Sequence, residues 1–179
     1  MIVLGIDPAL RNTGICLLDG PRVVLRDTLR CPAPGGPDEY AGGVGFWWWK
    51  WMGLGSAAKT LAAVVIEIPP ARVSGRTAQA GTVGHCSGVW RGLAEAVCGG
   101  ATIRSVAVAD WRRVMLGPGK SGADGGSWAK VVAIDALRKA QRPESEWPRN
   151  EHEAEAWCLA RWWQITRGAD PRLPAASER

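Results

Sequence analysis

The chain has 179 residues, of which 46% are hydrophobic and 22% are charged, and a formal net charge of +5 at pH 7. This length and balance are typical of one folded domain with a sizeable core. No apolar run reaches the ~18 residues that a membrane span requires. Met1 leads directly into strand-like sequence, so we expect neither a membrane anchor nor a secretory signal.

The charge and the cysteines indicate a class of partner and a compartment. A pI of about 9.2 suggests a polyanionic partner, although a basic soluble protein without such a partner has the same composition. The five cysteines include no CxxC pair. An odd number of thiols without a signal favours reduced cysteines in the cytoplasm, of a bacterium or a phage-infected cell, over a disulfide framework or a zinc site.

The first third of the chain predicts an antiparallel meander. Ile2–Ile6 and Gly14–Leu18 are short apolar runs that are typical of strands. Asp19-Gly20 is a hairpin turn signal, after which Val23–Leu25 continues as a third strand. Pro32–Gly45 is rich in proline and glycine and is expected to be a loop.

The middle of the chain contains a tryptophan-rich segment and a buried strand. Phe46–Thr60 carries four tryptophans and predicts an irregular helix. Three of them are consecutive and point in three directions, so at least two are expected in the core or in a dimer contact rather than stacked on bases. Leu61–Ile68 is apolar apart from Glu67 and is stopped by Pro69-Pro70, which is typical of a central strand covered on both faces.

A long helix is expected over Thr77–Val97. Its glycines at positions 81, 84, 88 and 92 share one face of that helix. Each glycine costs up to ~1 kcal/mol relative to alanine, a cost that is tolerated where another backbone must come close. Two interpretations remain open: tight packing of this face on the sheet, or a helix–helix contact across a dimer.

The rest of the chain predicts one strand and three helices. Ile103–Val108 is a strand, Asp110–Met115 begins a helix, and a glycine-rich loop spans Gly117–Ser127. Helices are expected over Ala129–Ala140 and from Asn150 onward. Strands first, then strands alternating with helices, predict an α/β fold with a mixed five-stranded sheet and helices on both faces. We expect one domain over residues 1–167 and a flexible tail over 168–179.

Two acids stand at the ends of predicted strands, Asp7 after the first and Glu67 near the end of the buried one. If the two strands are adjacent and parallel, both carboxylates emerge at the same edge of the sheet. Like charges placed together raise a pKa, and a divalent cation removes that cost. Hard oxygen ligands favour Mg²⁺ or Mn²⁺.

The last helix supplies further candidate ligands. His152 and Glu155 are three residues apart and project from one face, which Leu159 and Trp162 continue toward the sheet. Glu151 lies four residues before Glu155 and is within reach of the same site. Glu153 points elsewhere and is better explained as part of a capping box with Asn150. Taken singly, each of these acids has an ordinary structural explanation as a turn or surface residue.

Together these residues resemble those of RuvC-type Holliday-junction resolvases, in the ribonuclease H-like superfamily. The matching stretches are Gly5-Ile6-Asp7-Pro8 with Thr13-Gly14, then Ile66-Glu67, then His152-x-x-Glu155-Ala156, and they span nearly the whole chain. The resemblance implies that Asp7, Glu67, His152 and Glu155 are the catalytic residues and the ligands of two Mg²⁺ ions, for which Mn²⁺ can substitute. The family motif usually ends in Asp, so Glu155 is a departure from it.

The resemblance also implies an activity and partners. We expect a metal-dependent endonuclease that nicks paired strands of a four-way DNA junction, leaving 5′-phosphate and 3′-hydroxyl ends. Cutting two strands symmetrically calls for a homodimer. Neutral His152 is expected to be a metal ligand, whereas protonated His152 assists the leaving group, and the sequence leaves both roles open.

Several basic residues are candidates for contacts with the DNA backbone. By position around the glycine-rich loop, Arg112 and Lys130 match the lysines that the family places beside the scissile phosphate, with Lys120 as a competitor. Arg72 and Arg76 follow Glu67 and are expected to face DNA. For each of these five residues the alternative is a solvated surface charge.

Other functions share parts of this pattern. An actin-like or sugar-kinase ATPase also has Gly-Ile-Asp before a hairpin, but that fold needs two such domains. Gly119-Lys120-Ser121 lacks the first glycine of a P-loop, since Val114 stands there. The remaining alternatives are a branched-DNA binding module that does not cut, and a related nuclease with broader branched substrates.

Overall fold

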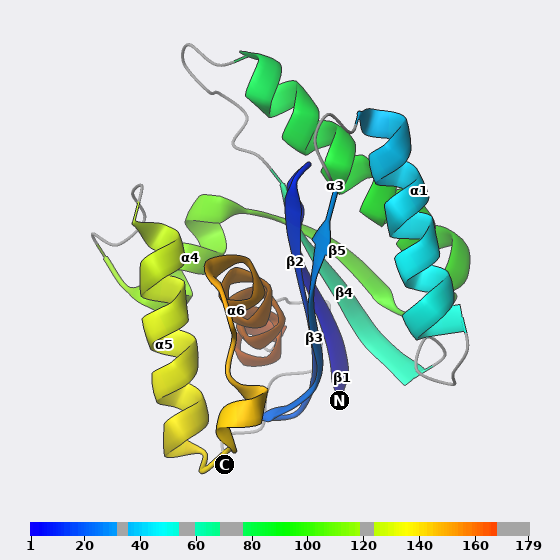
Figure 1. The fold of residues 1–179 in the computed structure, drawn as a ribbon. Helices are drawn as coiled ribbons and strands as arrows, with labels where there is room; N and C mark the ends of the chain where they lie inside the picture. The colour runs from blue at the N-terminus through cyan, green and yellow to red at the C-terminus, as the bar shows by residue number, and fades with distance from the viewer. Residues whose placement is uncertain (32–35, 54–59, 69–76, 119–123, 168–179) are drawn as a thin grey trace.

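The computed structural model describes residues 1–31, 36–53, 60–68, 77–118 and 124–167, and in them a five-stranded mixed sheet covered by helices on both faces (Figure 1). The strands lie in the order β3-β2-β1-β4-β5. Their bounds are β1 Ile2–Asp7, β2 Asn12–Asp19, β3 Arg22–Arg30, β4 Leu61–Ile68 and β5 Thr102–Ala107. The chain thus has the ribonuclease H-like fold that was predicted, with β1 antiparallel to β2 and parallel to β4.

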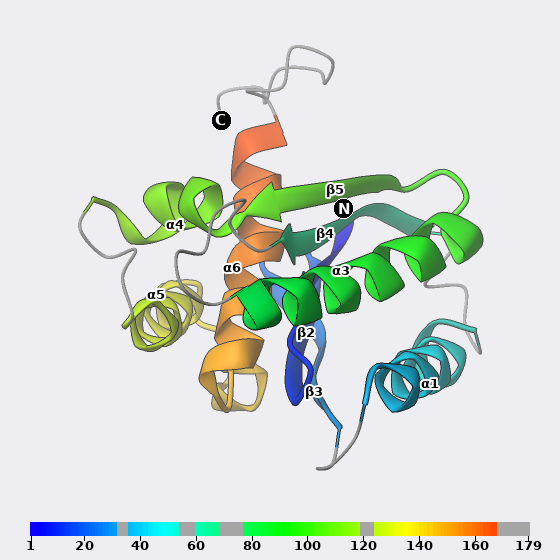
Figure 2. The ribbon, with the colours of Figure 1, turned by 90° about the horizontal axis from the view of Figure 1, so that it is seen from above.

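The helices divide between the two faces of the sheet. Helices α4, α5 and α6 cover one face, and α1 and α3 cover the other (Figures 1 and 2). Their bounds are α1 Pro37–Trp48, α3 Thr77–Val97, α4 Val108–Leu116, α5 Gly125–Lys139 and α6 Glu151–Thr166. A π-helical turn, η1, spans Trp49–Gly53, and a short 3₁₀ turn, η2, spans Glu144–Glu146. None of the described helices has both the length and the apolar character that crossing a lipid bilayer demands.

The alternation along β1 separates two cores. Val3 packs with the α4, α5 and α6 side, whereas Leu4 and Ile6 pack with the α1 and α3 side. Because successive side chains of a strand point to opposite faces, Gly5 and Asp7 share the face of Val3. Asp7 therefore emerges on the side of the sheet that α6 covers.

The tryptophan-rich region differs from its prediction. The expected loop over Pro32–Gly45 is wrong from Pro37 onward, because α1 begins there and packs Tyr40, Val44 and Trp47 into the core. This buried stripe at helical spacing outweighs the propensity cost of the glycines in α1. Trp47 and Trp48 are 3% and 4% exposed, while Trp49 is 60% exposed. The prediction that at least two of these tryptophans are structural is confirmed.

The glycine face of α3 does not pack on the sheet. A Cβ atom added at Gly84, Gly88 or Gly92 would meet nothing within 4 Å. The side chains that contact the sheet are instead those of Cys86, Trp90 and a buried alanine at position 94. Tight packing on the sheet is therefore the wrong interpretation of this glycine face, and a contact across a dimer stays a prediction.

Candidate functional site

The two strand-end acids lie side by side. Strands β1 and β4 are parallel with Ile6 opposite Ile66, so Asp7 and Glu67 follow at neighbouring positions on the same edge of the sheet. Val65 packs in the core on the α6 side, which places Glu67, two residues later, on that side too. The predicted convergence of Asp7 and Glu67 is thus confirmed by the strand register.

Two glycines let α6 lie unusually close to the sheet. A Cβ atom at Gly5 would lie 2.0 Å from the carbonyl oxygen of Ala156, and one at Gly14 would lie 1.9 Å from the carbonyl oxygen of His152. Real Cβ atoms do not approach so closely, so only glycine fits at these positions. The close approach brings the first turns of α6 over the end of β1 and the start of β2.

His152 and Glu155 meet Asp7 at this edge. Ligand atoms of the three residues lie within 4.8 Å of one another, as a metal centre requires. The Nδ1 atom of His152 is 3.0 Å from Oδ2 of Asp7. Asp7 and Glu155 are 6% and 8% exposed, whereas the His152 side chain is 37% exposed.

Two consecutive residues of α4 hold two of the acids. The indole N–H of Trp111 donates to Oε2 of Glu67 at 2.7 Å, and the guanidinium of Arg112 forms an ion pair with Glu155. The sequence analysis did not single out Trp111. Its only signal was a position directly before Arg112 in the helix after β5, which is too weak to identify a carboxylate partner.

Two acids at this site, Glu67 and Glu155, have pKa values above the ordinary value. Burial raises the pKa of Glu67 well above its ordinary value, and the neighbouring charges of Asp7 and Glu155 raise it further. Burial and then Asp7 raise the pKa of Glu155 to about 7, against the opposing effect of Arg112. The hydrogen bond to Asp7 raises the pKa of His152, although burial opposes this. The two glutamates are thus raised mainly by burial and then by neighbouring negative charge, and His152 by its hydrogen bond to Asp7.

This donor set fits a divalent cation. Asp7, His152 and Glu155 offer ligand atoms within 4.8 Å of one another. Glu67 lies outside that group of three but adds a carboxylate beside Asp7 on the neighbouring strand. Carboxylate oxygens are the ligands that Mg²⁺ and Mn²⁺ prefer. A cation at this point offsets the repulsion that raises the pKa values of Glu67 and Glu155.

The turn between β1 and β2 is anchored from the opposite face of the sheet. Thr13 is fully buried. Its hydroxyl accepts a hydrogen bond from the amide of Ala9 at 3.2 Å and donates one to the carbonyl oxygen of Ala9 at 2.9 Å. The same Oγ1 lies 2.7 Å from the hydroxyl of Tyr40, which accepts the indole N–H of Trp90 at 2.8 Å. Side chains from α1 and α3 therefore hold the turn that follows Asp7.

A second network fixes the start of α6 against the edge strand. Asn150 caps the helix as predicted, since its Oδ1 accepts the amide of Glu153 at 2.9 Å. The Glu153 carboxylate, however, accepts the amide of Arg149 instead of completing a capping box with Asn150. It is 1% exposed and also bonds to Arg26 and Thr28 of β3. Glu153 is therefore a buried ionic centre, and the predicted capping box is formed only by its Asn150 half.

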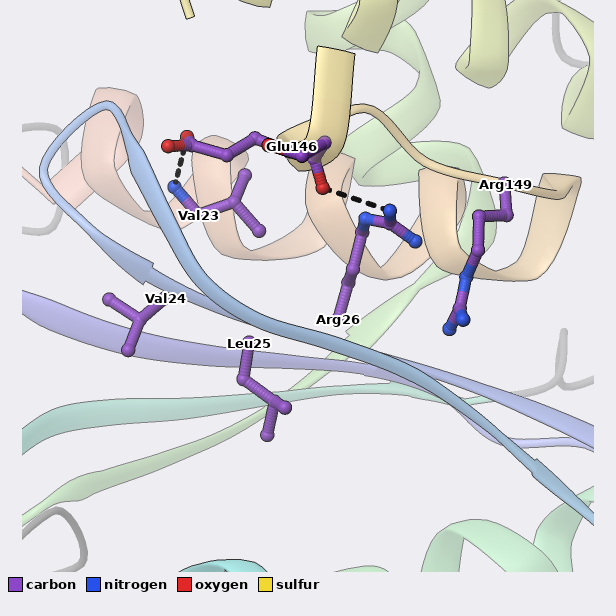
Figure 3. Close-up of a pocket in the computed structure, with 7 residues that line it drawn as sticks. Val23, Val24, Leu25, Arg26, Glu146 and Arg149 are labelled. Atoms are coloured by element: carbon purple, nitrogen blue, oxygen red, sulfur yellow. Dashed lines mark hydrogen bonds between the residues drawn. The ribbon is translucent and has the colours of Figure 1, made fainter. Parts of the chain in front are cut away.

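A pocket of about 270 Å³ opens beside this network (Figure 3). Its walls come from β3, η2 and the segment before α6, and Figure 3 shows Arg26 and Arg149 along one side of it. Glu146 accepts a hydrogen bond from the backbone amide of Val23 at 3.0 Å, and it forms an ion pair with Arg142. These contacts occupy the pocket's charged groups and tie η2 to the edge strand.

Replacing Glu153 by Gln is expected to lower the free energy of unfolding by about 3 kcal/mol, because it leaves a buried guanidinium group uncompensated. Burial opposes ionisation, but hydrogen bonds and charge from Arg149 and Arg26 hold the pKa of Glu153 below its ordinary value of 4.5. The unfolded chain therefore binds this proton more tightly. The contribution of Glu153 is complete above pH 4.5 and is lost as the pH falls through the native pKa.

The measurement is urea unfolding of the wild type and the Glu153→Gln variant between pH 3 and pH 7. The difference between the two proteins should shrink below pH 4.5. Glu95→Gln is the matched control, because Glu95 is half exposed and pairs with Arg91 on the surface of α3. Equal losses in the two variants at pH 7 would contradict the assigned role of Glu153.

The predicted DNA-contacting residues lie at different distances from the acids. Arg112 is at the site, where it pairs with Glu155. Lys130 lies beside the start of α6 and donates to the carbonyl of Arg149 at 3.1 Å. Arg72, Arg76 and Lys120 lie outside the described residues.

Two further predictions near the site are settled by contacts of α5. Glu151 does not join the metal-ligand cluster but accepts a hydrogen bond from Ser127 at 2.6 Å. The predicted loop over Gly117–Ser127 is wrong at its end, since α5 begins at Gly125. A Cβ atom at Gly125 would lie 2.3 Å from Nη1 of Arg112, so the glycine allows the first turn of α5 to lie over that guanidinium.

Comparison with known proteins gives matches in structure alone. No family model matches the sequence, and no curated protein matches it. A structure described as Thermus thermophilus RuvC in complex with a Holliday junction substrate aligns with a TM-score of 0.66 at 18% identity, covering 92% of this chain and 93% of that chain. The chain has the RuvC fold. The resemblance that the motifs predicted is confirmed at this level.

Two other RuvC-like structures agree. A second Thermus thermophilus RuvC structure aligns with a TM-score of 0.66 at 17% identity over 93% of this chain and 96% of that chain. The yeast mitochondrial Holliday junction resolvase Ydc2 aligns with a TM-score of 0.55 at 12% identity over 90% and 78%. Coverage near the full length of the chain shows that the RuvC fold accounts for nearly all of this protein.

Proposed function

We propose that this protein is a metal-dependent endonuclease that resolves four-way DNA junctions by paired nicking, leaving 5′-phosphate and 3′-hydroxyl ends. One observation carries the proposal: on a RuvC fold, Asp7 of β1 and His152 and Glu155 of α6 bring ligand atoms within 4.8 Å of one another. They do so at the edge of the sheet where the neighbouring strand β4 presents Glu67. A merely structural role for these acids does not account for three carboxylates gathered in a partly buried place.

In this proposal Asp7, Glu67, His152 and Glu155 hold two Mg²⁺ ions. When bound, such ions stabilise charge on a phosphodiester and lower the pKa of a water molecule. Arg112 keeps the Glu155 carboxylate turned into the site. Nδ1 of His152 lies 3.0 Å from Oδ2 of Asp7, and its partly exposed side chain is open to a bound DNA strand in this proposal.

The partners follow from the same proposal. Residues 1–167 act as one nuclease domain, which pairs with a second copy through the exposed glycine face of α3 so that two sites cut a junction symmetrically. Arg112, Lys130 and, outside the described residues, Arg72, Arg76 and Lys120 contribute positive charge to DNA binding. Because phosphate contacts release counterions, binding should weaken steeply with salt.

The test compares four-way, three-way and linear DNA of matched sequence, each with Mg²⁺, Mn²⁺ or Ca²⁺. Paired nicks in the four-way junction with Mg²⁺ or Mn²⁺ are the expected result, with binding alone in Ca²⁺. Ligation of the products without a kinase checks for 5′-phosphate ends. Junction binding without nicking in any metal would indicate a non-cleaving module, and equal nicking of linear DNA would indicate a nuclease with broader substrates.

A further inference from the structure

Glu67 lies near the end of the buried strand β4, beside Asp7 of the neighbouring strand β1. A carboxylate that is to bind a cation at this edge needs a hydrogen-bond donor that keeps it from rotating away. Among the described residues, the donor that bonds to its carboxylate is the indole N–H of Trp111, at 2.7 Å from Oε2.

Trp111 is well suited to hold a carboxylate still. Its side chain is fully buried in the core between the sheet and α6, so the packing of the core sets the position of its N–H. An indole nitrogen can donate a hydrogen bond but cannot accept one. Trp111 therefore occupies Oε2 of Glu67 and leaves the other oxygen, Oε1, available to a cation.

The next residue of α4, Arg112, holds a second carboxylate of the site, that of Glu155. Arg112 pairs with Glu155 of α6, and its guanidinium carbon lies 5.3 Å from the centre of the Trp111 ring. The dipeptide Trp111-Arg112 thus links one acid from the sheet to one acid from the helix. Both carboxylates are held by a single rigid turn.

We propose that Trp111 is a positioning residue that sets the affinity of the site for its divalent cation by fixing the Glu67 carboxylate. The proposal rests on the proposed metal-dependent cleavage and adds to it a residue that contacts neither metal nor DNA. Groups that hold a metal ligand in place change metal affinity by about tenfold or more when removed.

Trp111→Phe keeps the aromatic ring and removes the N–H. Metal-free protein is titrated with Mn²⁺, and electron paramagnetic resonance of the free ion measures its affinity without DNA or turnover. We expect the variant to bind Mn²⁺ about tenfold more weakly. It should also need about tenfold more Mg²⁺ for half-maximal cleavage, with the KM for the junction unchanged at saturating Mg²⁺.

Trp157→Phe is the matched control. Trp157 is 4% exposed and belongs to the same core, but its indole nitrogen has no hydrogen-bond partner in the described part of the chain. It should match Trp111→Phe in any loss of thermal stability and keep the wild-type affinity for Mn²⁺. Equal Mn²⁺ affinity in wild type and both variants, or equal loss in both, would overturn the proposal.

A second measurement covers the case in which Trp111→Phe does not fold. The indole N–H signals of ¹⁵N-labelled protein are recorded for the wild type and for Glu67→Gln. One signal should move in the variant, and the same signal should move when Mg²⁺ is added to the wild type. If no indole signal moves, the proposal fails. Wild type that neither binds Mn²⁺ nor cuts any DNA would instead refute the proposed function itself.

Discussion

Replacing Asp7 by Asn, or Glu67 by Gln, is expected to abolish cleavage of a four-way junction while leaving its binding largely intact. Each change removes one of the two carboxylates that lie at neighbouring positions near the ends of β1 and β4. A loss of about 4 kcal/mol of transition-state stabilisation, the order expected when a metal site fails, corresponds to about a 1,000-fold lower rate. Binding persists because the variants remove negative charge, which DNA repels.

Single-turnover cleavage and gel-shift assays in Ca²⁺ measure the two effects separately. Asp7→Asn and Glu67→Gln preserve the size of each side chain, so circular dichroism should match the wild type. Asp135→Asn, which removes a half-exposed carboxylate that pairs with Lys139 on the surface of α5, should cut at the wild-type rate. Retained cleavage in either acid variant, or lost binding by a folded variant, would contradict the roles assigned to Asp7 and Glu67.

Replacing Gly14 by Ala should have the largest effect on the architecture of the site. The new methyl group would lie 1.9 Å from the carbonyl oxygen of His152, so the start of α6 must move away from β2. Overpacking of this kind costs about 3 kcal/mol, or roughly 10 °C in Tm for a chain of this size. A displacement of about 1 Å at His152 is enough to lower the cleavage rate about 100-fold.

Gly42→Ala provides the comparison. A Cβ atom at Gly42 of α1 would meet nothing within 4 Å, so alanine there should raise the stability by up to ~1 kcal/mol. Differential scanning calorimetry measures the Tm of both variants, and single-turnover assays at saturating Mg²⁺ measure their cleavage rates. Unchanged Tm and activity in Gly14→Ala would show that α6 does not depend on this close approach.

The main lines of the fold were predictable because they depend on local pattern. Short apolar runs predicted all five strands, and the apolar character of Leu61–Ile68 identified the central one. The beginning of α1 was missed because its glycines lower helix propensity, while the burial of Tyr40 and Trp47 that compensates for them is a tertiary effect. Local propensity cannot report which face of a helix will be covered.

The candidate site was predictable only in part, for the same reason. Asp7 and Glu67 were found because parallel strands end at a common edge, and His152 and Glu155 because a spacing of three shares a helix face. Trp111 and the ionic role of Glu153 escaped prediction, since each depends on a partner more than 40 residues away in the sequence. Contacts of that range leave no local pattern.

The anchoring of Thr13 has a consequence for how this protein tolerates change. Tyr40 and Trp90 are buried behind the sheet, on the side away from the acids, yet their hydroxyl and indole groups end the chain of contacts that steadies the turn after Asp7. The candidate metal ligands therefore lie on one face of the sheet, and part of what holds their turn in place lies on the other. Substitutions at buried positions of α1 and α3 are expected to disturb the geometry of the candidate site without touching it.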